Sequence, residues 1–196
     1  VPVIPLTGIL ELDLNYIGIF LVPRHACKPV KGIQRCIHLA ASLAADTCTA
    51  VVLHIFLIHL SVLYPATHDT TYPLKNKLLC VRGNCDTEVD QMMLTFPILA
   101  RSAHIMLDDK SSFFLTHGHI WNETNFEQIF DGNAILVHGH THLPVNKISE
   151  KGFRVFNPGS ISLPKGGHPR TFGLYDTTTS DLSIRLLDDW KTIYTP

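Results

Sequence analysis

Three short turns in this chain carry side chains that are typical of a metal site. Residues 138–142 contain three histidines at alternate positions, and residues 117–119 add two more. Residues 83–86 supply an amide, a thiol and a carboxylate. Neutral imidazole is the commonest side-chain ligand for metal ions in proteins. An amide oxygen together with several imidazoles suits manganese, iron or zinc rather than calcium.

Each of these turns follows a stretch that the sequence predicts to be a strand. The apolar runs are residues 77–82, 112–116 and 134–137. In α/β folds, ligands gather at the carboxyl ends of strands, so turns that are distant in sequence can meet at one sheet edge. We therefore expect the three turns to form one site. For a lone pair of histidines, a solvated polar turn without a metal stays open as the alternative.

The remaining hydrophobic pattern predicts an α/β front followed by a strand-rich back. Residues 50–64 form the most apolar run, and they favour a buried parallel strand over a membrane helix because they fall short of about 18 apolar residues. A helix is expected from residue 87, with Asp86 or Thr87 as its N-cap. The other predicted elements are strands over 14–20, 105–107, 153–156, 171–175 and 182–187, and helices over 33–45 and 125–130.

Composition indicates one globular domain. The chain has 196 residues, with 45% hydrophobic and 17% charged residues. Its net charge of −1 gives no basic surface for nucleic acid or for an anionic membrane, and a homo-oligomer stays open. The five cysteines are odd in number and lack C-x-x-C spacing, which argues against a disulfide framework and favours a cytoplasmic location.

Four longer sequence motifs lie in a fixed order between residues 77 and 176. They are Val81-Arg-Gly-Asn-Cys-Asp-Thr-Glu-Val-Asp-Gln-Met-Met93, Leu115-Thr-His-Gly-His119, His138-Gly-His-Thr-His-Leu-Pro-Val145 and Phe156-Asn-Pro-Gly-Ser-Ile-Ser-Leu-Pro-Lys-Gly-Gly167. In content, order and spacing they resemble the YfcE-type phosphodiesterases, a branch of the calcineurin-like metallophosphoesterases. The resemblance implies an α/β fold, a four-layer α/β/β/α sandwich, formed by residues 1–196 as a single domain.

The same resemblance implies a site with two divalent metal ions, with manganese as the expected ion. Carried over by position, Asn84, His117 and His140 would hold one ion, and His142 would belong to the other. The implied activity is that of a metal-dependent phosphoesterase, which hydrolyses a small phosphodiester through a metal-activated water.

Two catalytic residues are also implied by the resemblance. Cys85 occupies the place where the wider superfamily has a histidine beside the scissile phosphoester, and Asp86 would orient or assist there. For Cys85, a small buried thiol without a catalytic role is the alternative. His119 is expected to orient a ligand or to meet the phosphate. His138 is expected to be a packed or exposed side chain and not a ligand, and residues 157–160 a structural turn.

The front part, residues 1–76, departs from the family pattern. The family has Asp-x-His after its first strand and Gly-Asp after its second, and neither motif is present here. His25 could stand for the missing histidine, while Pro23 and Ser61 lie where aspartates would be expected. Without a bridging carboxylate, two cations about 3.5–4 Å apart repel each other, which disfavours a complete dinuclear centre.

Two explanations for this departure stay open. The first is divergence toward a weakened or lost metal site, with partial replacement by Asp13, Asp46 or Asp69. The second is a shifted reading frame or faulty assignment within residues 21–76. Divergence also allows a rival function: a non-catalytic scaffold that binds proteins, like the retromer subunit that shares this fold.

Overall fold

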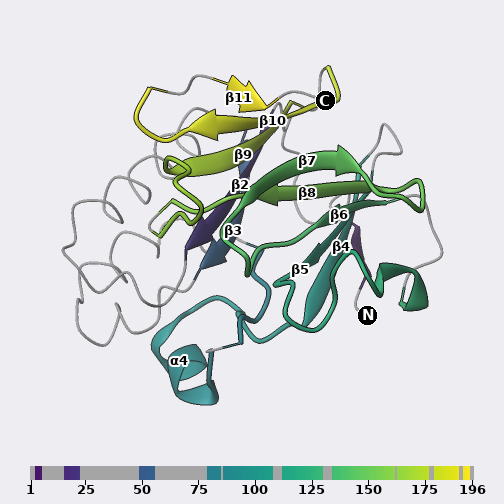
Figure 1. Ribbon diagram of the computed structural model, residues 1–196. Coiled ribbons are helices and arrows are strands. Elements are labelled where there is room, and N and C mark those ends of the chain that lie inside the picture. Colours follow the sequence, from purple (N-terminus) through teal and green to yellow (C-terminus); the bar gives the residue numbers. More distant parts are fainter. Residues whose placement is uncertain are drawn as a thin grey trace.

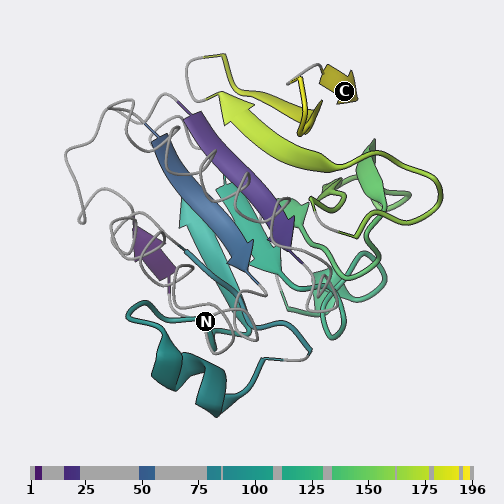
Figure 2. The same ribbon diagram turned by 90° about the vertical axis from the view of Figure 1, so that its left-hand side faces the viewer.

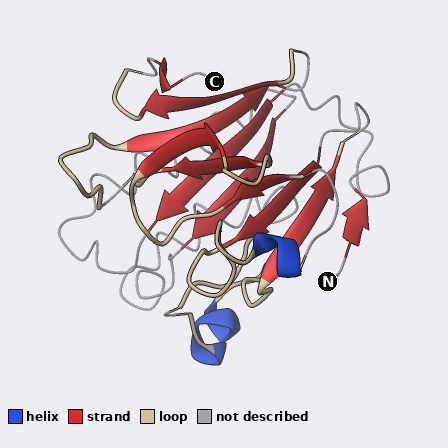
Figure 3. Cartoon of the chain, turned by 45° about the vertical axis from the view of Figure 1, so that its right-hand side comes forward, coloured by secondary structure: helices blue, strands red, loops and turns tan. Residues whose placement is uncertain are grey.

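The structure, a computed structural model, contains two β-sheets packed against each other (Figure 1). It describes residues 3–5, 16–22, 49–55, 79–84, 86–107, 112–129, 134–161, 163–176, 179–189 and 192–194, with the first three segments described by backbone alone. Strands make up most of the regular structure in these segments, together with a short α-helix and a 3-10 turn (Figure 3).

The first sheet has six strands in the order β1-β4-β5-β6-β8-β7. Strands β5, β6 and β8 are mutually parallel neighbours, whereas β4 and β7 run antiparallel to β5 and β8. The chain segments that follow β5, β6 and β8 therefore leave this sheet at the same edge. The strands are β1 (Val3–Pro5), β4 (Ser102–Met106), β5 (Ser112–Thr116), β6 (Ile135–Val137), β7 (Pro144–Ile148) and β8 (Arg154–Pro158).

The second sheet has five strands in the order β11-β10-β9-β2-β3. Its front-half strands, β2 and β3, pair in parallel, and β9 joins them antiparallel to β2. Strands from both halves of the chain thus share one sheet. The strands are β2 (Tyr16–Val22), β3 (Thr49–Ile55), β9 (Thr171–Asp176), β10 (Asp181–Leu186) and β11 (Thr192–Tyr194).

The main hydrophobic core lies between the two sheets. Figure 2 shows β2 and β3 in front of the teal strands of the other sheet. The Phe113 ring from β5 meets the Tyr175 ring from β9 edge to face, with centroids 4.8 Å apart. Leu182 and Ile184 from β10 join the same cluster, and both are fully buried. Burial of apolar surface between the two layers is the main force that holds them together.

The outer face of the first sheet has a smaller core of its own. Phe114 from β5 packs against Phe126, which lies in the 3-10 turn η3 (Phe126–Gln128), with ring centroids 5.4 Å apart. Leu136 and Val155 complete this cluster. Alternate residues of β5 therefore face opposite cores, as the two-residue period of a strand requires.

Most elements predicted within the described residues are confirmed. The helix α4 (Glu88–Met93) begins after Thr87 as N-cap, the strands around residues 108–111 pair antiparallel, and β9 pairs with β10. The predicted run 50–64 is a strand parallel to β2 over Thr49–Ile55. The helix expected over 125–130 is limited to the 3-10 turn η3. The helix expected over 33–45 lies outside the described residues.

One predicted strand is wrong where the structure describes it. Residues 79–82 belong to neither sheet, although Cys80 and Val81 are buried. Strand β4 already has β1 on one side and β5 on the other, so its two edges are occupied. The segment is tied to its neighbour by a bond from the Arg82 N–H to the Ala100 carbonyl at 2.6 Å. Its apolar residues fill the core without joining a ladder.

The sequence pattern also missed strands, notably β7. Pro144 opens it, and Lys147 and Ile148 at its far end are exposed, so the alternation of an amphipathic strand is weak. An edge strand tolerates both features because one of its sides has no partner strand. The strand is held by β8 and by the Asn146 side-chain amide, which donates to the Leu182 carbonyl across the core at 3.1 Å.

Among the described residues, no helix has both the length and the hydropathy needed to cross a membrane. The helical layers predicted for the outer faces of the sandwich stay a prediction.

We expect Phe113→Ala to lower the free energy of unfolding by about 3–5 kcal/mol, because it removes a fully buried ring between the sheets and leaves a cavity. Urea denaturation measures the change. The matched control is Ile148→Ala on the exposed end of β7, where the side chain is 63% exposed and a change within about 0.5 kcal/mol is expected. Equal effects of the two substitutions would contradict the position of the core.

Candidate metal centre

Three parallel strands deliver the histidine turns to one edge of the first sheet. His117 follows β5, residues 138–142 follow β6, and Asn157 lies near the end of β8. The strand ladders continue into these turns, because the Gly139 N–H donates to the His117 carbonyl at 2.9 Å and the His138 N–H donates to the Phe156 carbonyl at 3.0 Å. Of the three turns predicted to meet, the two histidine turns therefore lie together at this edge.

Gly118 allows the two histidine turns to approach closely. Its φ of 106° is one that residues with a side chain rarely adopt. A Cβ added there would lie 3.0 Å from His138 Nδ1 and 3.1 Å from the Gly139 carbonyl oxygen. The turn after β5 therefore depends on glycine both for its conformation and for the space beside residues 138–139.

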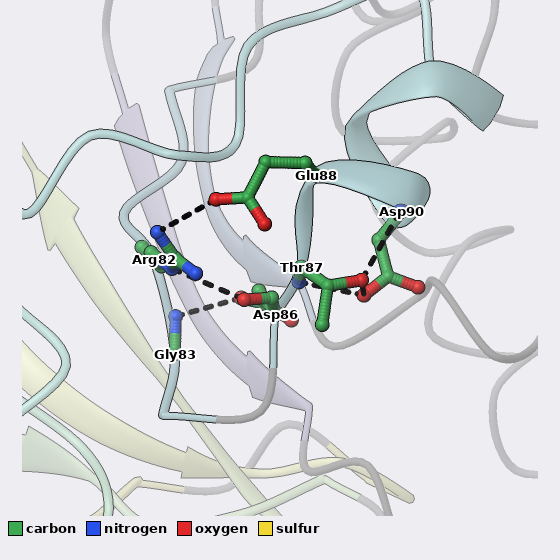
Figure 4. A network of polar contacts seen from close by, with 6 residues as sticks. All are labelled: Arg82, Gly83, Asp86, Thr87, Glu88 and Asp90. Atoms are coloured by element: carbon green, nitrogen blue, oxygen red, sulfur yellow. Dashed lines mark hydrogen bonds and ion pairs between the residues drawn. The ribbon is translucent and has the colours of Figure 1, made fainter.

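The third turn, residues 83–86, is closed by a buried carboxylate. Asp86 is 5% exposed, and its Oδ2 accepts the Gly83 N–H at 2.6 Å (Figure 4). The Arg82 Nε–H donates to the Asp86 carbonyl at 3.1 Å. These bonds fix the backbone on both sides of Asn84. The observed contact of Asp86 is thus with the turn that carries a candidate ligand.

Helix α4 anchors the far end of this turn through a capping box. The Thr87 Oγ1 accepts the Asp90 N–H, and Asp90 Oδ2 accepts the Thr87 N–H at 2.7 Å (Figure 4). This reciprocal pair satisfies donors that the first helical turn leaves open. The ion pair of Arg82 with Glu88, 3.4 Å, is largely exposed and contributes little to stability.

Three of the four predicted metal ligands come together. His117 Nε2 lies 3.0 Å from Asn84 Oδ1 and 3.1 Å from His140 Nδ1. The ring of His119 stands nearby, with its centroid 5.0 Å from that of His117 and 6.1 Å from that of His140. His117 is buried at 2% exposure, whereas His119 and His140 are exposed. One buried and two exposed imidazoles therefore line the sheet edge beside the Asn84 amide.

The spacing of these atoms fits a divalent cation. Ligands about 2.1 Å from an ion and at right angles to each other lie about 3.0 Å apart, which is the separation seen here. Hydrogen bonds alone explain the two contacts of His117 Nε2 poorly. This ring nitrogen carries either one hydrogen or one lone pair, but it has two close polar neighbours. Around a cation, all three atoms would contribute lone pairs to one centre.

The fourth predicted ligand, His142, contacts the loop that follows β8. Its Nδ1 lies 2.8 Å from the Leu163 carbonyl oxygen, which can only accept, so Nδ1 carries the hydrogen and Nε2 has the lone pair. That is the tautomer a metal ligand needs.

His140 and His142 both have positive φ, 66° and 63°. A conformation that is costly for residues with a Cβ is thus used twice within three residues.

Two further histidines stand beside the site. Partial burial lowers the pKa of His119, and the nearby His140 and Arg82 lower it further by repelling positive charge. Burial also lowers the pKa of His138, while its bond to the Gly139 carbonyl acts in the opposite direction. His138 Nδ1 lies 3.1 Å from that carbonyl oxygen and the residue is 8% exposed. Of the two alternatives left open for His138, packed or exposed, the structure shows the packed one.

Several predicted site residues lie outside the described residues. They are Cys85, His25 and the alternative carboxylates Asp13, Asp46 and Asp69. Within the described segments, no group of three or more His, Cys, Asp or Glu side chains is arranged to hold an ion. The cluster found here contains two histidines and an amide.

The structural turn predicted at residues 157–160 is confirmed by the backbone contacts of Asn157 and Ser160. The Gly159 N–H donates to Asn157 Oδ1 at 3.0 Å, and the Leu163 N–H donates to Ser160 Oγ at 3.0 Å. Asn157 also reaches the histidine turn, a contact that the sequence did not reveal. No local pattern signals it, because it joins two parallel strands that are not consecutive in the chain.

Comparison with known families places these features in context. The chain matches the family model of the calcineurin-like phosphoesterase superfamily domain over residues 36–180. It is 47% identical over 118 residues to phosphodiesterase YfcE of Escherichia coli strain K12, and equally to that of Escherichia coli O157:H7. These alignments cover 60% of this chain and 61% of each relative, so they span less than two thirds of the curated relatives.

The fold similarity extends further along the chain. The structure of the Escherichia coli phosphoesterase Yfce matches 92% of this chain and 98% of its own with a TM-score of 0.74 and 34% identity. A predicted phosphoesterase from Streptococcus pneumoniae TIGR4 matches with a TM-score of 0.57 over 89% and 90% of the two chains, and its 18% identity supports the fold alone.

We expect Gly118→Ala to destabilise the fold more than Gly152→Ala, as measured by urea denaturation. Gly152 also has positive φ, 90°, but a Cβ there would meet nothing within 4 Å, so only the backbone cost of about 1–3 kcal/mol applies. At Gly118, the turn of residues 138–139 must also shift, which adds about 1 kcal/mol or more. Equal losses would show that close approach of the two histidine turns contributes nothing to stability.

Proposed function

Because the chain belongs to the calcineurin-like phosphoesterase superfamily, we propose that it is a metal-dependent phosphodiesterase acting on a small phosphodiester. The relatives found are named phosphodiesterases or phosphoesterases, which gives the scaffold hypothesis no support. The net charge of −1 is the argument for a small substrate in place of a nucleic acid.

The observation that carries the proposal is that Asn84 Oδ1 and His140 Nδ1 lie 3.0 and 3.1 Å from His117 Nε2. These three residues would hold one divalent ion, and the mixed oxygen and nitrogen set favours manganese, iron or zinc. His142 would belong to a second ion, since its tautomer leaves Nε2 as the coordinating nitrogen. The number of ions depends on carboxylates outside the described residues.

A divalent cation at this site would supply charge stabilisation for the phosphate oxygens and would lower the pKa of a coordinated water. The chain itself supplies the alignment. His117 is fixed by burial at the end of β5, and Asn84 is fixed by the turn that Asp86 closes. Such preorganised groups need no rearrangement during the reaction, which is the main source of electrostatic catalysis.

The side chains around this cluster would handle the substrate. His119 is exposed beside His117 and His140, so its ring N–H can donate to a phosphate oxygen. Asp86 would act by holding the backbone of residues 83–86 in place, consistent with its bond to Gly83. We retain Cys85, next to Asn84 in the sequence, as the residue proposed to meet the scissile phosphoester.

We expect the purified chain to retain about one or more manganese ions after incubation with Mn²⁺ and dialysis, since its donor set matches that metal. Elemental analysis measures the content. His140→Ala is expected to retain less, because it removes one of the three converging donors. A wild-type chain that holds no more metal than this variant would contradict the assignment of His140.

We expect Mn²⁺ to support hydrolysis of an aryl phosphodiester such as bis(p-nitrophenyl) phosphate. His117→Ala should lower kcat/KM by about 100-fold or more, because it removes the donor that links Asn84 and His140. Lys151→Ala, which breaks an exposed ion pair with Glu127, serves as the control and should leave the rate unchanged.

Stoichiometric manganese binding without turnover above the His117→Ala background would reject the enzymatic function. That outcome would favour the non-catalytic scaffold.

A further inference from the structure

Asn157 is a fully buried amide that reaches from β8 into the turn between the candidate metal ligands. Its Nδ2 donates to the Gly139 carbonyl at 3.1 Å and to Thr141 Oγ1 at 3.0 Å, while its Oδ1 accepts the Gly159 N–H at 3.0 Å. A carbonyl can only accept and a backbone N–H can only donate, so these partners fix the orientation of the amide.

The two ends of this amide serve different parts of the chain. Oδ1 closes the turn of residues 157–160, as the sequence predicts. The two Nδ2 hydrogens are donated to residues 139 and 141, which lie in the turn after β6, the parallel neighbour of β8. A residue that shaped its own turn alone would have no need of the second pair of bonds.

Thr141 is the point where this amide engages the histidine turn. Its hydroxyl also accepts the Leu143 N–H at 3.4 Å, and its own N–H donates to the Gly139 carbonyl at 2.7 Å. On either side of it, His140 and His142 have positive φ. Because that conformation is costly for residues with a Cβ, outside contacts must hold it.

We propose that Asn157 and Thr141 are positioning residues, which hold the backbone of residues 139–142 so that His140 meets Asn84 and His117. The inference rests on the proposed function, because it assigns these bonds a role in metal binding. Outer hydrogen bonds of this kind orient metal ligands, and their loss typically weakens metal affinity by about 10–100-fold. Neither residue contributes a donor atom to the ion in this proposal.

The test measures the affinity for Mn²⁺ alone by isothermal titration calorimetry. Thr141→Val keeps the shape of the side chain but removes the hydroxyl, and we expect about 10-fold weaker binding. Thr141→Ser keeps the hydroxyl and should restore most of the affinity. Thr179→Val makes the same substitution in an exposed turn on the second sheet and should bind as the wild type does.

Thr141→Val leaves one Nδ2 hydrogen of the buried Asn157 unpaired, so its urea midpoint should fall below that of Thr179→Val, and a cooperative unfolding transition in each shows that both variants are folded. Wild-type affinity in Thr141→Val, or equally weak binding in Thr141→Ser, would overturn the positioning role. A wild-type chain that binds no Mn²⁺ would overturn the proposed function itself, and the positioning role with it. The two failures are therefore distinguishable in one set of titrations.

Discussion

The candidate site depends on one backbone hydrogen bond, from the Gly139 N–H to the His117 carbonyl. It continues the parallel pairing of β5 and β6 beyond the last strand residues, and so places the two histidine turns side by side. With this bond in place, His117 and His140 lie within 3.1 Å of each other although 23 residues separate them. The core that buries Phe113 and Leu136 on opposite faces of the sheet keeps the strands in this register.

Unfavourable backbone conformations and close approaches are concentrated around the hydrogen bond between Gly139 and His117. Gly118 leaves room for residues 138–139, and Gly159 leaves room for Thr171, whose hydroxyl an added Cβ would overlap. His140 and His142 adopt positive φ without being glycine. Each feature is unfavourable locally, and they lie together where three strand ends supply side chains for chemistry. A rigid two-sheet scaffold can hold such strain, and functional sites are where it usually occurs.

Hydrophobic periodicity and turn residues predicted the helices and strands whose formation depends on short stretches of sequence. The Thr87 cap, the antiparallel pairing of β4 with β5 and the strand at Tyr16–Val22 follow from short stretches of sequence. The convergence of His117 and His140 also followed, because strand ends share an edge in α/β folds, whereas Asn84 reaches them from a segment that joins neither sheet. The sequence did not reveal that residues 79–82 stay outside the ladder, since pairing depends on which edges are already occupied. The contact of Asn157 with Thr141 was missed for a similar reason, because it joins strands that are not consecutive.

Anomalous diffraction at the manganese absorption edge, from crystals soaked in Mn²⁺, tests the central claim most directly. The account predicts a peak within about 2.0–2.3 Å of Asn84 Oδ1, His117 Nε2 and His140 Nδ1, as first-row metal–ligand distances require. A site that stays empty at saturating Mn²⁺, or a peak that lacks His117 among its ligands, would contradict it.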